Sequence, residues 1–133
     1  MKKNYFKLFK KFMLFAAVII VFTWAGSVFI VRYKIRSAEK RYYRDYVKII
    51  NYDFNKYKQN ATINVAIENF GKRLLDSINV KIDYYDTDGK LLGTDLSDIL
   101  KMSKDSLYPE SGKVFRIDVT CSEETTEIKL SIN

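Results

Sequence analysis

Residues 12–31 read FMLFAAVIIVFTWAGSVFIV, and none of these 20 residues is charged. As a helix rising about 1.5 Å per residue, this stretch is roughly 30 Å long, which matches the hydrocarbon core of a bilayer. A surface helix of a soluble protein is apolar on one face, whereas this stretch is apolar all round. It lies between Lys11 and Arg32. The sequence therefore predicts a transmembrane helix over 12–31.

Both flanks of this span are basic. Residues 1–11 form a short basic tail, and residues 32–45 contain good helix formers without Gly or Pro, which predicts a helical juxtamembrane stalk. Anionic lipid headgroups attract such flanks, so the bilayer is the first predicted partner. The flanking residues are Lys2, Lys3, Lys7, Lys10, Lys11, Arg32, Lys34 and Arg36.

The orientation of the span depends on more than charge, because the two flanks are similarly basic. The short tail and the compact region after the stalk favour a cell-membrane protein with its carboxyl-terminal domain outside the cytoplasm. A cleaved signal peptide ending near Ser27 is the alternative, and it would release a secreted protein. Apolar residues continue to Val31, beyond the usual 7–15 residues of a signal peptide, which favours a retained signal anchor.

The net charge of +7 over 133 residues is compatible with a nucleic-acid-binding protein, but the distribution of the charge along the chain argues against one. Residues 1–48 contain 12 Lys and Arg against two acidic residues, a net charge of +10. Residues 49–133 contain 11 Lys and Arg against 14 acidic residues, a net charge of −3. The basic excess brackets the span, so we expect no nucleic-acid partner.

The chain has no histidine and a single cysteine, Cys121. This composition excludes an intramolecular disulfide, the usual Cys/His zinc site, and nucleophilic sites that use an imidazole base. Asp86, Asp88, Asp95 and Asp98 cluster around a turn, but their spacing does not fit an EF-hand loop. We therefore expect no enzyme activity, no catalytic residue, no metal site and no cofactor.

Beyond residue 46 the apolar residues alternate with polar ones, which is typical of strands with one buried face. In 61–69, for example, Ile63, Val65 and Ile67 share one face. Asp88-Gly89 is a strong turn signal between two such runs. The pattern predicts an all-β, immunoglobulin-like antiparallel sandwich of about seven short strands over 46–133. The expected strands are 61–69, 77–86, 113–121 and 126–133, with weaker signals at 46–52 and 91–95.

Residues 63–94, INVAIENFGKRLLDSINVKIDYYDTDGKLLGT, resemble the FxLYD domain of bacterial surface proteins. Asn69-Phe70-Gly71 stands where a family strand ends, and IDYYD at 82–86 stands at the naming motif, with Ile for Phe and Tyr for Leu. Residues 107–112, LYPESG, resemble the family's Leu-x-Pro-Gly-Glu turn with its Gly displaced. The resemblance implies an exported, membrane-tethered sandwich without catalytic residues. The motif residues are Asn69, Gly71, Ile82, Tyr84, Tyr85, Asp86, Gly89, Pro109 and Phe115.

Two functions remain open at this point. The domain is expected to contact a protein partner or an envelope polymer at the cell surface. Alternatively, the chain is an accessory subunit of a membrane complex and acts through its span, in which Thr23 and Ser27 form a small-xxx-small pair. The sequence specifies neither the partner nor the oligomeric state.

Overall fold

The structure is a computed structural model that describes the backbone of residues 2–133 and the side chains of residues 9–133. It contains two compact units, which divide between Glu39 and Lys40 and are described separately. The elements in chain order are α1 (Lys2–Tyr46), β1 (Val47–Tyr57), β2 (Asn60–Asn69), β3 (Asn79–Tyr85), β4 (Leu91–Asp98), α2 (Ile99–Ser103), β5 (Ser111–Thr120) and β6 (Glu127–Ile132).

Helix α1 runs without interruption through the predicted span and stalk. It already begins at Lys2, so the basic tail is part of the same helix. The only glycine in it is Gly26, and it contains no proline that would break the backbone hydrogen bonds. A helix followed by a β-sandwich confirms the predicted fold class.

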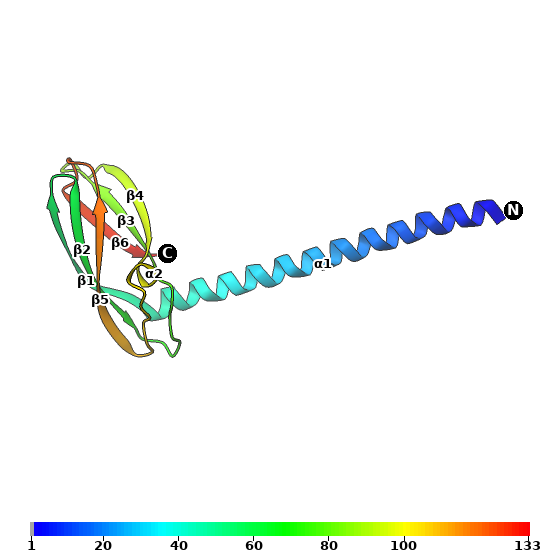
Figure 1. Cartoon of the computed structure of the whole chain (residues 1–133), viewed down its shortest axis with the longest axis horizontal. Coiled ribbons are helices and arrows are strands. Elements are labelled where there is room, and N and C mark those ends of the chain that lie inside the picture. Colours follow the sequence, from blue (N-terminus) through cyan, green and yellow to red (C-terminus); the bar gives the residue numbers. More distant parts are fainter. Residues whose placement is uncertain (1) are drawn as a thin grey trace. The chain divides into compact units, whose positions relative to one another are not determined.

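The sandwich consists of two three-stranded antiparallel sheets (Figure 1). Their strand orders are β1-β2-β5 and β4-β3-β6. In the nomenclature of an immunoglobulin sandwich, these orders correspond to strands A-B-E and to strands C′-C-F. Within residues 2–133, the part that the structure describes, six strands form where about seven were predicted.

The core lies between the two sheets and follows the predicted alternation. In β2, the side chains of Ile63, Val65 and Ile67 are buried, and their neighbours are partly exposed. Strand β3 alternates in the same way. Burying large aliphatic side chains from both inner faces supplies the main stabilisation of such a domain. The remaining large core residues are Ile78, Val80, Ile82, Tyr84, Leu100, Leu107, Phe115, Ile117 and Ile128.

Strand β1 extends to Tyr57, five residues beyond the predicted 46–52. A register shift against β2 at Ile49–Asn51 marks a bulge, which interrupts the alternation on which the sequence prediction depends. Beyond the bulge, Tyr52 Oη donates to the Ile128 carbonyl (3.0 Å), and Lys56 Nζ donates to the Thr125 carbonyl (2.8 Å). Long polar side chains thus connect this edge strand to β6 and to the loop before it.

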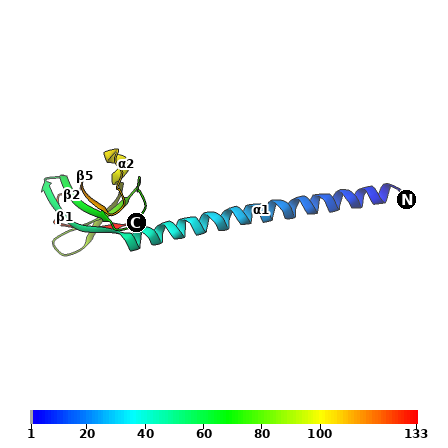
Figure 2. The same ribbon diagram turned by 90° about the horizontal axis from the view of Figure 1, so that it is seen from below.

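Residues 99–103 form the short helix α2, which is not among the predicted elements. Asp98 caps its first turn by accepting a hydrogen bond from the Lys101 N–H, and Lys104 ends it with a left-handed backbone. Ile99 and Leu100 are buried. Figure 2 shows α2 beside β5, at one corner of the domain.

Candidate functional site

The apolar part of α1 is exposed around its whole circumference. In the stretch of highest hydropathy, no residue is buried by other parts of the structure, and the side chain of Phe29 is 73% exposed. Residues Phe9–Tyr46 include one span with the length and composition of a membrane anchor or a signal sequence. A helix with this surface requires an apolar environment around it.

The two small polar residues of the span satisfy their own hydrogen bonds. Thr23 Oγ1 donates to the Ile19 carbonyl (2.8 Å), and Ser27 Oγ donates to the Thr23 carbonyl. Such bonds within one helix remove the cost of placing a hydroxyl in hydrocarbon. Neither hydroxyl therefore requires a second helix.

The predicted membrane flanks lie on the same helix. Lys10, Lys11, Arg32, Lys34 and Arg36 all have exposed side chains. The side chains of Lys2, Lys3 and Lys7 lie outside the described part of the chain. Exposed Lys and Arg at the ends of a span can extend to the headgroup layer.

The last turns of α1 dock onto the sandwich through Tyr42, whose ring covers Gly71. A Cβ atom at Gly71 would lie 2.1 Å from Tyr42 Oη and 2.6 Å from Tyr42 Cζ, so a side chain at this position would collide with the ring. Tyr42 Oη accepts a hydrogen bond from the Arg73 N–H (2.9 Å), and the Arg73 guanidinium lies over the ring, 5.1 Å from its centroid.

Two further hydrogen bonds hold this helix end. Tyr43 Oη donates to the Ser77 carbonyl (2.7 Å), and the Phe70 N–H donates to the Tyr46 carbonyl (2.8 Å). Residues 40–46 consequently belong to the compact unit of the sandwich. We call the contacts of Tyr42, Tyr43, Asn69, Gly71 and Arg73 the junction.

Asn69 is the centre of the junction and is completely buried. Its Nδ2 donates to the carbonyls of Arg73 (2.7 Å) and Tyr108 (3.2 Å). Its Oδ1 accepts from the Gly71 N–H (3.0 Å) and from Tyr42 Oη (3.3 Å). One amide thus connects the helix end to two loops, which explains why both motif residues, Asn69 and Gly71, lie here.

The IDYYD motif residues have structural contacts in β3. Ile82 and Tyr84 are buried, and Tyr84 Oη donates to Asp95 (2.9 Å). Burial, followed by this bond to a carboxylate, raises the pKa of the Tyr84 hydroxyl well above its usual value. The Lys129 ammonium lies over the Tyr85 ring, 4.9 Å from the ring centroid. These contacts stabilise the sheet β4-β3-β6.

Asp86 and Gly89 form the predicted turn. Asp86 Oδ1 accepts from the N–H groups of Asp88 (2.9 Å) and Lys90 (2.8 Å), and Gly89 has a φ of 76°. Three of the four carboxylates that cluster in the sequence are thus engaged separately: Asp86 by this turn, Asp95 by Tyr84, and Asp98 by α2. Among the described residues, no three acidic or Cys side chains lie together as a metal would require.

The motif residues Pro109 and Phe115 lie on either side of the start of β5. Pro109 is exposed in the loop before the strand, and Phe115 is part of the core. Glu110 follows Pro109 and has a φ of 51°. Its N–H donates to the Gly71 carbonyl (3.2 Å), so this strained residue also supports the junction.

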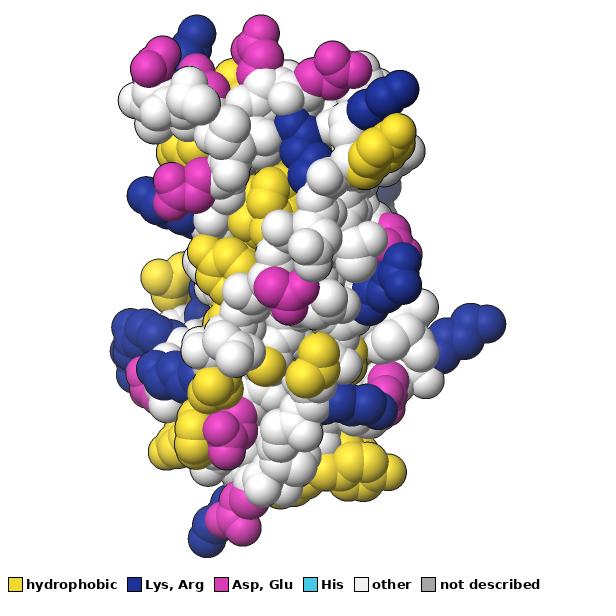
Figure 3. Space-filling model, turned by 90° about the vertical axis from the view of Figure 1, so that its left-hand side faces the viewer, with side chains coloured by type: hydrophobic (Ala, Val, Ile, Leu, Met, Phe, Trp, Pro, Cys, Tyr) yellow, Lys and Arg dark blue, Asp and Glu magenta, His cyan; other side chains and the backbone are white. Residues whose placement is uncertain are grey.

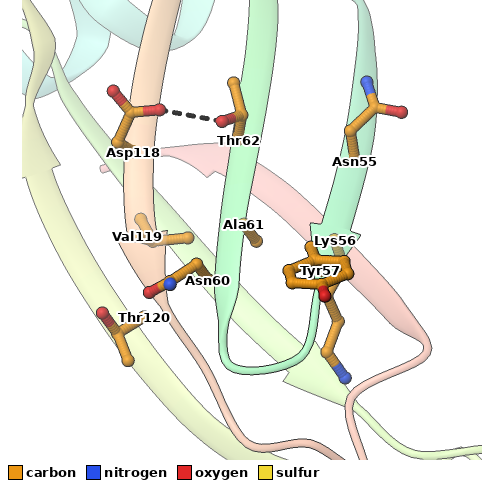
Figure 4. A pocket seen from close by; sticks show the side chains of 9 residues that line it. All are labelled: Asn55, Lys56, Tyr57, Asn60, Ala61, Thr62, Asp118, Val119 and Thr120. Atoms are coloured by element: carbon orange, nitrogen blue, oxygen red, sulfur yellow. Dashed lines mark hydrogen bonds between the residues drawn. The ribbon is translucent and has the colours of Figure 1, made fainter.

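An open depression of about 540 Å³ lies on β1, β2 and β5, at the end where β1 turns into β2 (Figure 4). Tyr57 and Asn60 border it, and Asp118 is the only acidic residue among those that line it. Hydrogen bonds from Thr62 Oγ1 (2.8 Å) and then Arg116 lower the pKa of the Asp118 carboxyl. A single ionised carboxylate does not provide the acid pair that glycoside hydrolysis uses.

Similarity to known proteins is limited to remote structural likeness. No protein-family model matches the chain, and no curated protein matches it. A crystal structure of a DUF1425 family member from Shewanella sp. pv-4 has a TM-score of 0.47 at 10% identity, over 65% of this chain and 76% of that one. The crystal structure of the C-terminal domain of wzt has a TM-score of 0.40 at 16% identity, over 56% of this chain and 50% of that one. The FxLYD resemblance stays a prediction.

Proposed function

We propose that this chain is a single-pass membrane protein that presents a small, non-catalytic, immunoglobulin-like sandwich outside the cell membrane. The observation that carries the proposal is the span 12–31, which is uncharged and exposed on every side. The domain that follows has its own buried core and is held to the end of the same helix. A retained anchor makes use of both features, whereas a cleaved signal peptide would remove the helix.

The domain's task is binding, in this proposal. Polar side chains of the motif already make structural hydrogen bonds: Asn69 in the junction, Tyr84 with Asp95, and Asp86 within its turn. The resemblance to the FxLYD family, an exported and tethered sandwich, supports the same reading. The partner is a protein or an envelope polymer that meets the domain at the bilayer surface.

Protease treatment of intact cells tests the location. We expect residues 46–133 to be degraded while a fragment containing 12–31 stays in the membrane. Cells with permeabilised membranes, in which both sides are accessible, are the control. If the domain resists protease in intact cells and is degraded only after permeabilisation, the proposed sidedness is wrong.

A span exchange tests whether the domain or the helix carries the function. Replacement of 12–31 by an unrelated uncharged helix of the same length keeps the anchor and removes any specific helix contact. If the domain acts as proposed, partners recovered from membranes by crosslinking are unchanged. Their loss would favour the accessory-subunit hypothesis, in which the span itself recognises another helix.

A further inference from the structure

Several large apolar side chains are exposed at the end of the sandwich where α1 ends. We call this the proximal end and define it by the segments 40–46, 70–76 and 104–110. Phe70, Leu74 and Tyr108 are 51%, 56% and 65% exposed there. These values separate them from the core residues of the same loops, Leu75 and Leu107, which are 6% and 1% exposed.

Backbone pairing places two of these side chains together. Leu75 and Leu107 form an isolated antiparallel bridge, with hydrogen bonds in both directions (2.9 and 2.8 Å). Leu74 and Tyr108 are the next opposed pair in this register, on the face opposite the buried leucines. The fully hydrogen-bonded amide of Asn69 holds both loops, so the exposed pair stands on a rigid base.

Charge also differs between the proximal end and the rest of the domain. The segments of the proximal end contain six Lys and Arg against four acidic residues, and the rest of 40–133 contains nine against 11. Among the proximal residues, Lys72 and Arg73 directly follow Phe70-Gly71. On the face seen in Figure 3, acidic side chains gather at the opposite, upper end. An anionic surface would therefore attract the proximal end more than the rest of the domain.

The segment between the predicted span and this unit is short. Only residues 32–39 separate the predicted span from the unit that begins at Lys40. As eight helical residues they rise about 12 Å. The headgroup layer is itself about 5–8 Å thick on each side of the hydrocarbon core. Aromatic side chains with Lys and Arg beside them are the composition that interfacial anchors use.

We propose that the proximal end is a lipid-docking surface, which rests Phe70, Leu74 and Tyr108 on the anionic headgroups of the bilayer that holds the anchor. This inference rests on the proposed function, because it requires a retained span. Docking would set the orientation of the domain and turn the β1–β2 hairpin away from the lipid. It would thereby leave the opposite end free for a partner.

The test uses the full chain in liposomes of equal parts phosphatidylglycerol and phosphatidylcholine. A fluorophore is attached to Asp76→Cys at the proximal end or, as the matched control, to Gln59→Cys in the β1–β2 hairpin, both with Cys121→Ser. Spin-labelled lipids quench the fluorophore by contact. We expect strong quenching at residue 76, little at residue 59, and a large loss of quenching at 76 in pure phosphatidylcholine.

Two variants separate docking from mere proximity. Lys72→Gln should lower the ratio of docked to undocked chains about fivefold, and added salt should have a similar effect. Leu74→Ser with Tyr108→Ser should abolish the excess quenching at 76. Both replaced side chains are exposed, and an unchanged unfolding midpoint verifies that the domain stays folded.

Equal quenching at 59 and 76, or quenching at 76 that is independent of lipid charge and of these variants, would overturn the proposal. Crosslinking of residue 76 to a second copy or to another protein, with no lipid quenching, would also overturn it. Flotation of the chain with the liposomes after alkaline washing is measured in parallel. Its failure would refute the retained anchor, whereas failed quenching with intact flotation would refute docking alone.

Discussion

Replacement of Gly71 by alanine should weaken the junction through a collision with one identified side chain. The new Cβ would lie 2.1 Å from Tyr42 Oη and 2.6 Å from Cζ, far inside contact distance. Overpacking of this kind costs about 1–3 kcal/mol. The ring can relieve it only by moving away and giving up its hydrogen bonds with Arg73 N–H and Asn69 Oδ1, at about 1 kcal/mol each. By either route we expect a loss of about 2–3 kcal/mol.

The collision predicts a dependence on Tyr42 that a double-mutant cycle measures. In a Tyr42→Ala background the space is open, and Gly71→Ala should be neutral or slightly stabilising, by up to about 0.5 kcal/mol. The coupling energy between the two positions should therefore be about 2 kcal/mol. Gly112→Ala is the matched control, because its Cβ would meet nothing closer than 3.5 Å.

Urea unfolding of the full chain in detergent micelles, followed by circular dichroism, gives the free energies. Hydrogen exchange of the Arg73 amide reports on the junction directly, because this amide donates to Tyr42 Oη. We expect faster exchange in Gly71→Ala. If Gly71→Ala lowers the free energy of unfolding equally in the wild-type and Tyr42→Ala backgrounds, the proposed collision is refuted.

Three further substitutions test separate parts of the account. Asn69→Asp places a carboxylate against the Arg73 and Tyr108 carbonyls in a fully buried site. Urea unfolding should therefore show that the free energy of unfolding falls by about 3 kcal/mol or more. A fall of less than about 1 kcal/mol would contradict the hydrogen-bond network. Glu110→Gly should stabilise by about 1 kcal/mol in the same assay, since φ is 51° there, and any destabilisation would count against the strain. Partial burial opposes ionisation of Asp98, but hydrogen bonds from Ser77 and two backbone N–H groups outweigh this effect and lower the pKa of the carboxyl. The ionised carboxylate therefore stabilises the fold above about pH 4, and this stabilisation is lost as the pH falls through the folded-state pKa. Wild type should therefore lose more stability in acid than Asp98→Asn, and parallel pH profiles would contradict this.

The sequence predicts the elements whose signal is local. The apolar run predicts the helix, because no other arrangement satisfies a backbone in lipid. Alternation predicts β2 and β3, since each strand has one face in the core. In both cases the signal depends on residues that are neighbours in the chain.

The elements that the sequence leaves out depend on contacts between distant residues. The second half of β1 is polar in sequence, and it is held as a strand because Tyr52 bonds to a carbonyl of β6 and Lys56 to a carbonyl in the loop before β6. Its hairpin uses Lys58 at a φ of 55° in place of the expected glycine. Asp98 before an apolar pair was a usable sign of α2, since Asp is a preferred helix cap.

The junction shows the same division. The resemblance marks Asn69 and Gly71 as motif residues, and Asn-x-Gly after a strand predicts a turn. Nothing near them in sequence indicates Tyr42, which is 27 residues before Asn69. Only the folded chain reveals that the glycine makes room for a ring from the helix.

The central claim is that the span stays in the membrane with the sandwich attached. The most direct test is the intact mass of the chain recovered from cell membranes after alkaline carbonate washing, together with that of any chain in the medium. The account predicts a washed-membrane chain that retains residues 12–31. A chain found in the medium that begins just after Ser27 would contradict it.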